Sequence, residues 1–174
     1  MEGVLRVEEV NALGNEQFVW IFNNIVESYP SVATTISKQR PFASADHLAD
    51  AAAQYLDQLT PPDKEEVLRL HPDLAGRLAD EGKLTSESTM EQRSAGLHNL
   101  SPEDKAKINQ LNASYQEKFG FPFVICAREN KAAAILQGLQ TRLHNSREKE
   151  LETGIAEVKK ICRLRVKALV LSEN

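Results

Sequence analysis

Cysteine is scarce in this sequence, with Cys126 and Cys162 as the two cysteines among 174 residues. Two cysteines are too few for a disulfide framework, and both lie among apolar neighbours, so we expect reduced, buried thiols in a reducing compartment. Eight glycines and seven prolines are also few, which excludes collagen-like and low-complexity chains. The apolar fraction of 41% is near the globular norm, so a chain of this length can bury a hydrophobic core.

The sequence also lacks an excess of positive charge and a long apolar run. Its formal net charge is -4 and its isoelectric point is near 5.6, which argues against a non-specific nucleic-acid binder, because such binding depends on neutralising phosphates. No apolar run approaches the roughly 20 residues of a membrane span, and residues 1–13 contain no signal-peptide core. We therefore expect a soluble, intracellular protein with a single domain over residues 1–174.

Apolar residues recur at helical spacing along most of the chain, and strand-like alternation is never longer than a few residues. Asn15 is expected to cap a helix that Pro30 stops, and Ser44 to cap another. Another helix is expected to begin at Pro61–Pro62. Four more are expected from Ser88 (or from Thr85, one turn earlier) to Gly96, from Ser101 to Gly120, from Ala132 to Leu143 and from about Arg147 to Leu171. The predicted fold is all-α, a single-domain bundle of about eight helices.

Two segments interrupt this helical pattern. Residues 71–85 contain a proline, two glycines and three acidic residues, which is typical of a loop or a loosely helical connection. Residues 119–128, FGFPFVICAR, are apolar but too short for a helix and, because of Pro122, unsuited to a central strand. We expect this second segment to be a buried extended stretch or a tight turn.

His71 is the strongest candidate for chemistry among the four histidines. It follows a predicted helix directly and stands beside Pro72 and Asp73, whereas the other three lie in polar, helical contexts. A loop histidine suits acid–base catalysis because its pKa lies near neutrality; the alternative is that His71 only caps the preceding helix. A metal site at His71 and Asp73 would have two ligands and no accompanying zinc motif. Walker, dinucleotide-binding and serine-hydrolase motifs are absent from the sequence.

Polar residues on two other predicted helices are further candidates. Glu91 and Gln92 lie in the first turn of a helix that would begin at Ser88. They either complete a capping box with Ser88 or present a carboxylate and a carboxamide to a pocket. Arg165 lies beside the apolar stripe of the C-terminal helix, where a half-buried guanidinium is suited to bind a carboxylate or an oxyanion.

Several segments combine these candidates in one order along the chain. They are Arg40-Pro41-Phe42, His71-Pro-Asp-Leu-Ala-Gly76, Ser88-Thr-Met-Glu91-Gln92, Ala95-Gly96-Leu97, Leu111-Asn112 with Tyr115, FGFPFVICAR at 119–128, and Glu157-Val-Lys-Lys-Ile161 with Leu164-Arg165. Together they resemble the 2-oxo-4-hydroxy-4-carboxy-5-ureidoimidazoline (OHCU) decarboxylases over nearly the whole chain. HPDLAG and FGFPFVICAR at their observed separation make the resemblance specific.

The resemblance implies an all-α carboxy-lyase that needs no cofactor and no metal, acts as a homodimer and converts OHCU to (S)-allantoin in urate degradation. It implies catalytic roles for His71, Glu91 and Arg165. It places substrate contacts at Pro72, at Ser88, Thr89, Met90, Glu91 and Gln92, and at the backbone of Phe123, Val124, Ile125, Cys126 and Ala127. Vertebrate members often end in a peroxisomal Ser-Lys-Leu tripeptide, whereas this chain ends in Ser-Glu-Asn, so we expect a peroxisomal or a cytoplasmic location.

Two other functions are compatible with parts of the pattern. A helical protein-interaction module without catalysis would account for the capping residues and the charged faces, but not for the loop histidine or the FGFPFVICAR segment. A metal-dependent hydrolase would use His71 and Asp73 as ligands. An assay of substrate consumption with and without a chelator separates all three functions.

Overall fold

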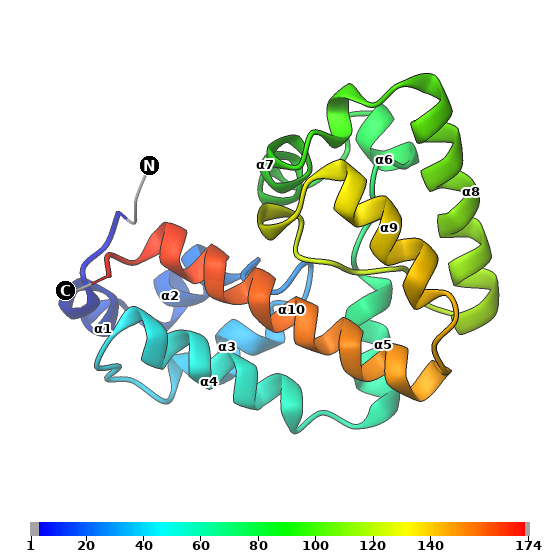
Figure 1. Cartoon of the computed structure of the whole chain (residues 1–174). Coiled ribbons are helices and arrows are strands. Elements are labelled where there is room, and N and C mark those ends of the chain that lie inside the picture. The colour runs from blue at the N-terminus through cyan, green and yellow to red at the C-terminus, as the bar shows by residue number, and fades with distance from the viewer. Residues whose placement is uncertain (1–3, 173–174) are drawn as a thin grey trace. The chain divides into compact units, whose positions relative to one another are not determined.

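The structure is a computed structural model that describes residues 4–172. Within this range it contains ten α-helices and two short 3-10 helices (Figure 1). They are α1 (Val7–Ala12), α2 (Asn15–Phe22), α3 (Ser31–Ser37), α4 (Ala45–Asp57), α5 (Pro61–Arg69), α6 (Arg77–Asp80), α7 (Ser86–Ser94), η1 (Leu97–Asn99), α8 (Pro102–Phe119), η2 (Ala127–Glu129), α9 (Ala132–Arg142) and α10 (Arg147–Leu169). The predicted all-α class is confirmed. The α-helices that the sequence did not predict are the short α1, α3 and α6, of six, seven and four residues.

Two compact units make up the described part of the chain. Unit 1 contains the described residues up to Val67 and from Lys159 onward, and unit 2 contains Leu68–Val158. The 23-residue helix α10 is shared, because its first half belongs to unit 2 and its second half to unit 1. That residues 1–174 form one domain stays a prediction.

Unit 1 contains α1 to α4, α5 up to Val67 and the second half of α10. Helix α3 packs against both α2 and α4. Phe18 and Phe22 are fully buried, and their ring centroids lie 4.6 Å apart. The guanidinium of Arg40 lies 4.9 Å from the centroid of the Phe18 ring and donates to the carbonyl of Val10 at 3.0 Å. These contacts form a core in which aromatic rings and the Arg40 side chain hold α1 against α2.

The two ends of the described chain pair with each other in unit 1. The Leu5 N–H donates to the carbonyl of Leu169 at 3.0 Å, and the Leu171 N–H donates to the carbonyl of Leu5 at 2.7 Å, so that Leu5 and Val170 form a parallel β-bridge. Two residues of the C-terminal tripeptide considered for targeting, 173 and 174, lie outside the described residues, as do residues 1–3 of the N-terminal stretch.

Helix α2 stops well short of Pro30, contrary to the prediction, and its N-cap is Gly14 rather than the expected asparagine. Beyond its end, the Ser28 N–H donates to the side-chain oxygen of Asn24 at 2.8 Å, while the Asn24 carbonyl accepts from Arg165 at 2.8 Å. These side chains satisfy backbone groups in the turns that follow the helix. Arg165 is 141 residues away in the sequence, so no local pattern indicates this contact.

Unit 2 contains α6 to α9, both 3-10 helices and the first half of α10. Helix α8 packs against α9, and α7 packs against η1 and η2 (Figure 1). The apolar segment that follows α8 is buried, since Phe121, Phe123 and Val124 are at most 4% exposed. It runs without regular secondary structure until η2 begins at Ala127. The predicted buried extended stretch is therefore confirmed.

Local capping signals predicted both ends of α8 and gave two candidate starts for α7. Ser101 caps α8 through its side chain, and Gly120 follows the helix in the left-handed conformation, with φ of 80°. Of the two predicted starts of α7, Ser88 is wrong and the alternative, Thr85, is confirmed. The N-cap is Thr85, whose hydroxyl oxygen accepts from the Ser88 N–H at 3.2 Å. Glu91 therefore lies beyond the first turn and is not part of a capping box.

The expectation that both cysteines are reduced and buried is confirmed. Cys126 and Cys162 are free thiols and both are buried. His47, His98 and His144 are exposed. Within residues 4–172, none of the helices combines the length and the apolar character that crossing a membrane requires.

Candidate active site

His71 lies where the sequence predicts it, directly after α5. Its N–H donates to the Leu68 carbonyl at 3.1 Å, and the residue is only 8% exposed. Residues 72–76 are irregular, until the short helix α6 begins at Arg77. The backbone of His71 thus caps α5, as one of the two interpretations held. The imidazole is not needed for that cap and remains a candidate acid–base group.

The loop that carries His71 is anchored to α7 by Gln92. The side-chain oxygen of Gln92 accepts from the Ala75 N–H at 3.0 Å, and its amide nitrogen donates to the carbonyl of Asp73 at 3.4 Å. Ala75 adopts a positive φ of 52°, and a Cβ on Gly76 would lie 2.8 Å from the Cβ of Asp73. The loop is therefore tightly folded, and the buried carboxamide of Gln92 satisfies backbone groups that its folding exposes.

Helix α8 supplies two further anchors for the same loop. Asn112 donates to the carbonyl of Leu74 at 3.1 Å, and Gln116 donates to the carboxylate of Asp73 at 2.6 Å. Burial raises the pKa of Asp73, and the hydrogen bond from Gln116 opposes that effect. Among residues 4–172, no group of three or more histidine, cysteine, aspartate or glutamate side chains lies close enough together to hold a metal ion.

The five α7 residues expected to contact substrate differ in accessibility. Ser88 and Gln92 are buried, Thr89 and Glu91 are half-buried, and Met90 is 65% exposed. Thr89 and Gln92 line a pocket of about 290 Å³ in unit 2. Because its oxygen and nitrogen both bond the loop, Gln92 acts as an anchor of the His71 loop rather than as a free carboxamide.

Glu91 lies close to the segment 123–127. Helix α7 packs against η2, which begins at the end of this segment. Burial raises the pKa of the Cys126 thiol to about 11, and the negative charges of Glu129, Glu157 and Glu91 add to this effect. The structure thus brings the α7 residues and the FGFPFVICAR backbone together within unit 2.

Two backbone groups of the segment 123–127 are held by charged side chains. The Cys126 N–H donates to Glu157 Oε1 at 3.0 Å, and the Val124 carbonyl accepts from Arg142 Nη1 at 2.8 Å. The backbone groups that have no protein partner among the described residues include those of Phe123 and Ile125 and the N–H of Ala127. Phe123 and Ala127 are buried and Ile125 is half-buried.

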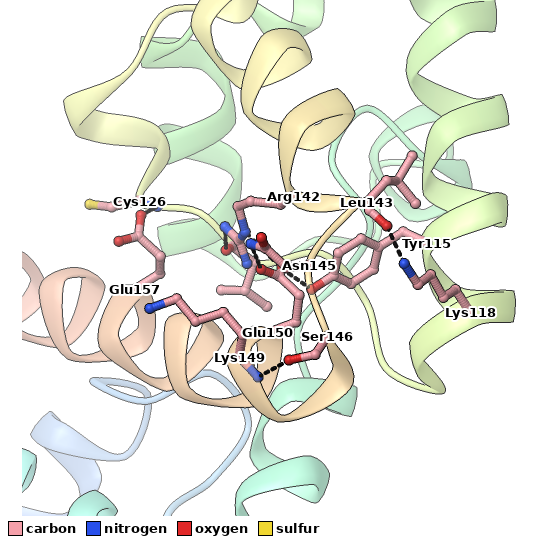
Figure 2. A network of polar contacts seen from close by, with 11 residues as sticks. Tyr115, Lys118, Cys126, Arg142, Leu143, Asn145, Ser146, Lys149, Glu150 and Glu157 are labelled. Atoms are coloured by element: carbon pink, nitrogen blue, oxygen red, sulfur yellow. Dashed lines mark hydrogen bonds and ion pairs between the residues drawn. The ribbon is translucent and has the colours of Figure 1, made fainter.

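Arg142 belongs to a buried polar network (Figure 2). Its Nε donates to Glu150 Oε1 at 2.8 Å, the Tyr115 hydroxyl donates to the same oxygen at 2.5 Å, and Asn145 donates to the other carboxylate oxygen at 2.8 Å. Glu150 is fully buried, so these donors replace the water that would otherwise solvate its charge. Burial and the neighbouring Glu150 raise the pKa of Tyr115 well above its ordinary value. The guanidinium also lies 4.3 Å from the centroid of the Phe123 ring.

Arg165 lies in unit 1, in a buried ion pair. Its Nη1 contacts Glu27 Oε1 at 3.0 Å and the carbonyl of Asn24 at 2.8 Å. The two charged side chains are 5% and 4% exposed. The sequence predicted a half-buried guanidinium, whereas the residue is buried and has a carboxylate partner in its own unit. Its contact with substrate stays a prediction.

Sequence reasoning assigned no role to four charged residues with buried partners, namely Glu27 in unit 1 and Arg142, Glu150 and Glu157 in unit 2. Glu150 and Glu157 lie on the apolar stripe of α10, together with Ile161. A carboxylate on such a stripe needs a buried partner, and this mismatch is the signal that identifies them. Glu27 and Arg142 offer no comparable signal, because their partners are distant in sequence or belong to the backbone.

The chain is similar to proteins of known function over most of its length. The model of the OHCU decarboxylase family matches residues 11–167. The 2-oxo-4-hydroxy-4-carboxy-5-ureidoimidazoline decarboxylase of Xenopus laevis is 47% identical, over 95% of this chain and 94% of its own length. The protein of the same name from Mus musculus is 43% identical, over 93% of this chain and 91% of its own length.

Two solved structures share the fold. The crystal structure of an OHCU decarboxylase in the presence of (S)-allantoin matches with a TM-score of 0.69 and 24% identity, over 88% of this chain and 96% of that one. The crystal structure of an (S)-allantoin synthase matches with a TM-score of 0.74 and 21% identity, over 93% of this chain and 53% of that one. At these identities the likeness concerns the fold alone. The family model and the relatives above 40% identity decide the classification: the chain belongs to the OHCU decarboxylase family.

Proposed function

We propose that this chain is a carboxy-lyase that decarboxylates OHCU to (S)-allantoin in urate degradation. Membership of the OHCU decarboxylase family supports the reaction. The structural observation that carries the proposal is the attachment of the His71 loop to α7 through Gln92. Together with the packing of α7 on η2, it gathers the loop, the α7 residues and the segment 123–127 within unit 2.

The reaction needs an acceptor for the electron pair that the departing CO2 leaves behind. As the bond to the carboxylate breaks, this pair moves into the adjacent ring C=N, whose nitrogen takes up a proton. The hydroxyl on the same carbon then loses its proton and becomes a carbonyl, while the carbon that bears the ureido group is protonated on one face. One proton is consumed overall. Because the substrate itself accepts the electrons, the proposal includes neither a metal nor a cofactor.

The residues of unit 2 supply the proton transfers and the binding groups in this proposal. His71 accepts the proton of the substrate hydroxyl. Glu91 pairs with ureido or ring N–H groups and is a second candidate for moving a proton. The backbone of the segment 123–127 fixes the ring, and its apolar side chains remove water from around the carboxylate. Gln92 acts indirectly, by holding the His71 loop.

Arg165 keeps its predicted role in this proposal, that of binding a carbonyl or carboxylate oxygen of the substrate. The resemblance supports this role, and so does the chemistry of a guanidinium, which can bond several acceptors at once. Its pairing with Glu27 fixes the direction of the side chain inside unit 1.

Replacing His71 by alanine tests the proposal most directly. We expect kcat to fall by roughly 10²–10⁴-fold, the usual contribution of a general acid or base, while the helix content is retained. The measurement is the loss of ultraviolet absorbance of freshly generated OHCU, with far-ultraviolet circular dichroism as the check on folding. His144→Ala, at an exposed histidine of the same unit, is the matched control. Near-normal activity of His71→Ala would remove His71 from the mechanism.

The same assay separates the alternatives. An interaction module without catalysis would leave OHCU to decay at its spontaneous rate, and a metal-dependent hydrolase at His71 and Asp73 would lose its activity after exhaustive chelation. Protonation on one face predicts an excess of (S)-allantoin, which circular dichroism of the product measures. A racemic product would place the final protonation in solution.

We also propose that the protein is a homodimer and that it acts in the peroxisome or the cytoplasm. The resemblance to the family supports both statements. Sedimentation equilibrium at micromolar concentration tests the first, because a dimer has twice the chain mass of 19.4 kDa. Imaging of the full chain tests the location. The fluorescent protein is fused to the N-terminus so that the C-terminus, where peroxisomal signals are read, stays free.

A further inference from the structure

Helix α10 presents two buried carboxylates to unit 2. Glu150 is fully buried and Glu157 is 8% exposed. They are seven residues apart, which is about two helical turns, so both point to nearly the same side of the helix and lie about 10 Å apart along its axis. Neither belongs to the acid–base machinery proposed above.

Each of these carboxylates is linked to a backbone group of the segment 123–127. Glu157 reaches the segment directly, because its Oε1 accepts from the Cys126 N–H at 3.0 Å. Glu150 reaches it through Arg142, which donates from Nε to Glu150 at 2.8 Å and from Nη1 to the Val124 carbonyl at 2.8 Å. Figure 2 shows the two connections side by side above α10.

The backbone groups held in this way alternate with groups that are not held. In an extended chain the N–H and C=O of residues i and i+2 point to one side, and those of the intervening residues point to the other. Fixing Val124 and Cys126 toward α10 therefore turns the backbone groups of Phe123 and Ile125 to the opposite side. The same anchors set the direction of the Ala127 N–H at the start of η2.

We propose that Glu157 and the Arg142–Glu150 pair are positioning residues, which hold the segment 123–127 so that its alternate backbone groups face the substrate. This inference rests on the proposed function, since it assigns the unheld groups to OHCU. Hydrogen bonds to charged partners are shorter and stronger than neutral ones, so these anchors restrict the segment more than backbone pairing alone would. The segment has no regular secondary structure, and side chains must therefore supply this restriction.

The experiment compares three variants on the full chain. Glu157→Leu removes the acceptor for the Cys126 N–H, whereas Glu157→Gln keeps an acceptor oxygen at the same position. Arg142→Lys keeps the positive charge, but its single ammonium cannot bond Glu150 and the Val124 carbonyl with the planar geometry of a guanidinium. Glu152→Gln, at an exposed glutamate of the same helix, is the control.

We expect Glu157→Leu and Arg142→Lys to raise KM for OHCU by roughly 10- to 100-fold, the equivalent of one charge-assisted hydrogen bond, and to lower the excess of (S)-allantoin. Glu157→Gln, which keeps a neutral acceptor, is expected to raise KM less than Glu157→Leu does, and Glu152→Gln to keep KM and the enantiomeric excess close to those of the wild type. A purely structural role would lower the melting temperature and the amount of active enzyme without changing KM or the stereochemistry. An unchanged KM and enantiomeric excess in Glu157→Leu would overturn the proposal.

Hydrogen–deuterium exchange gives a readout that does not depend on activity. In the wild type, the Cys126 amide should exchange slowly, and in Glu157→Leu it should exchange at least about tenfold faster, because its acceptor is gone. Unchanged exchange would show that Glu157 does not hold the segment. A wild-type chain that neither consumes OHCU nor binds (S)-allantoin would overturn the proposed function, and the positioning role with it, while the exchange result would still report on the anchors.

Discussion

Buried charged side chains determine much of the local geometry at the scale of single residues. Arg165 bonds the Asn24 carbonyl just beyond the end of α2, and Glu27 pairs with the same guanidinium. Removing one partner of such a pair leaves an unpaired buried charge, which costs far more than the pair itself contributes. Exposed pairs on the same helix behave differently, because water solvates each partner when the other is removed.

Replacing Arg165 by methionine is therefore expected to lower the free energy of unfolding by about 3–5 kcal/mol, because Glu27 stays buried without its partner. The double variant Arg165→Met with Glu27→Met should recover part of this loss. Urea unfolding followed by circular dichroism gives the measurement. Arg163→Met is the control, since Arg163 pairs with Asp46 while its own side chain is 38% exposed, and roughly 0–1 kcal/mol is typical of exposed pairs. A loss in Arg165→Met no larger than in Arg163→Met would contradict the argument.

Sequence reasoning located the chemically distinctive residues and missed the residues that hold them. His71 stands out because a histidine next to a proline after a helix is locally unusual. The resemblance implies a substrate contact at Gln92, and nothing in the sequence shows that its side chain bonds the backbone groups of Asp73 and Ala75. Every residue has the same backbone groups, so the sequence does not show which of them accept or donate to a side chain. In the sequence, a side chain that bonds the backbone therefore cannot be distinguished from one that binds a ligand.

At the scale of elements, helix ends were predictable where one residue determines them. Ser101 and Gly120 bound α8 by their own conformational preferences. The start of α7 was ambiguous, because Thr85 and Ser88 are both good caps and lie one turn apart. The structure identifies Thr85 as the N-cap, because its hydroxyl oxygen accepts a hydrogen bond from the Ser88 N–H. The end of α2 was out of reach, since Phe22 and the C-cap residue Asn23, in the right-handed conformation, carry no helix-stop signal.

Two glycines inside helices make a matched pair for testing how tightly the elements of unit 2 pack. A Cβ on Gly138 of α9 would meet Ile125 Cδ1 at 3.6 Å, an ordinary contact. A Cβ on Gly154 of α10 would lie 2.9 Å from Cδ2 of Leu68, which is fully buried. We expect Gly138→Ala to raise the free energy of unfolding by roughly 0.5–1 kcal/mol through helix propensity.

Gly154→Ala gains the same propensity but is expected to be destabilising overall, because overpacking of a core typically costs about 1–3 kcal/mol. Both variants are compared with the wild type by urea unfolding under the same conditions. If Gly154→Ala were as stable as Gly138→Ala, α10 would not be in close contact with Leu68, and the packing described for this helix would be wrong.

At the scale of the whole molecule, α10 belongs to the core of both units, and each unit contains one buried cysteine. Cys126 lies in unit 2 and Cys162 in unit 1. Burial raises the pKa of Cys126 to about 11 and that of Cys162 to about 12. Unfolded thiols ionise near pH 8.5, so above this pH the unfolded chain binds fewer protons than the folded one. The free energy of unfolding should therefore fall as the pH rises from about 8.5 toward 11.

The two thiols also report whether the units unfold together. We expect neither thiol to react with a disulfide reagent in the native protein at pH 8, and both to react in denaturant. In moderate urea the two should become reactive at the same rate, because disruption of α10 removes part of the core of each unit. Single variants Cys126→Ala and Cys162→Ala assign the rates. Different rates for the two thiols would show that each unit opens independently.

The bridge between Leu5 and Val170 has a mechanical consequence. The two chain segments that it joins run parallel, so one chain end leaves the bridge in the direction opposite to the other. Tension applied between the ends would slide the two segments along each other and load the Leu5–Leu169 and Leu171–Leu5 hydrogen bonds at the same time, instead of breaking them one after the other. Force applied to the N-terminus is thereby transmitted to the last turn of α10, and the bridge resists it in shear.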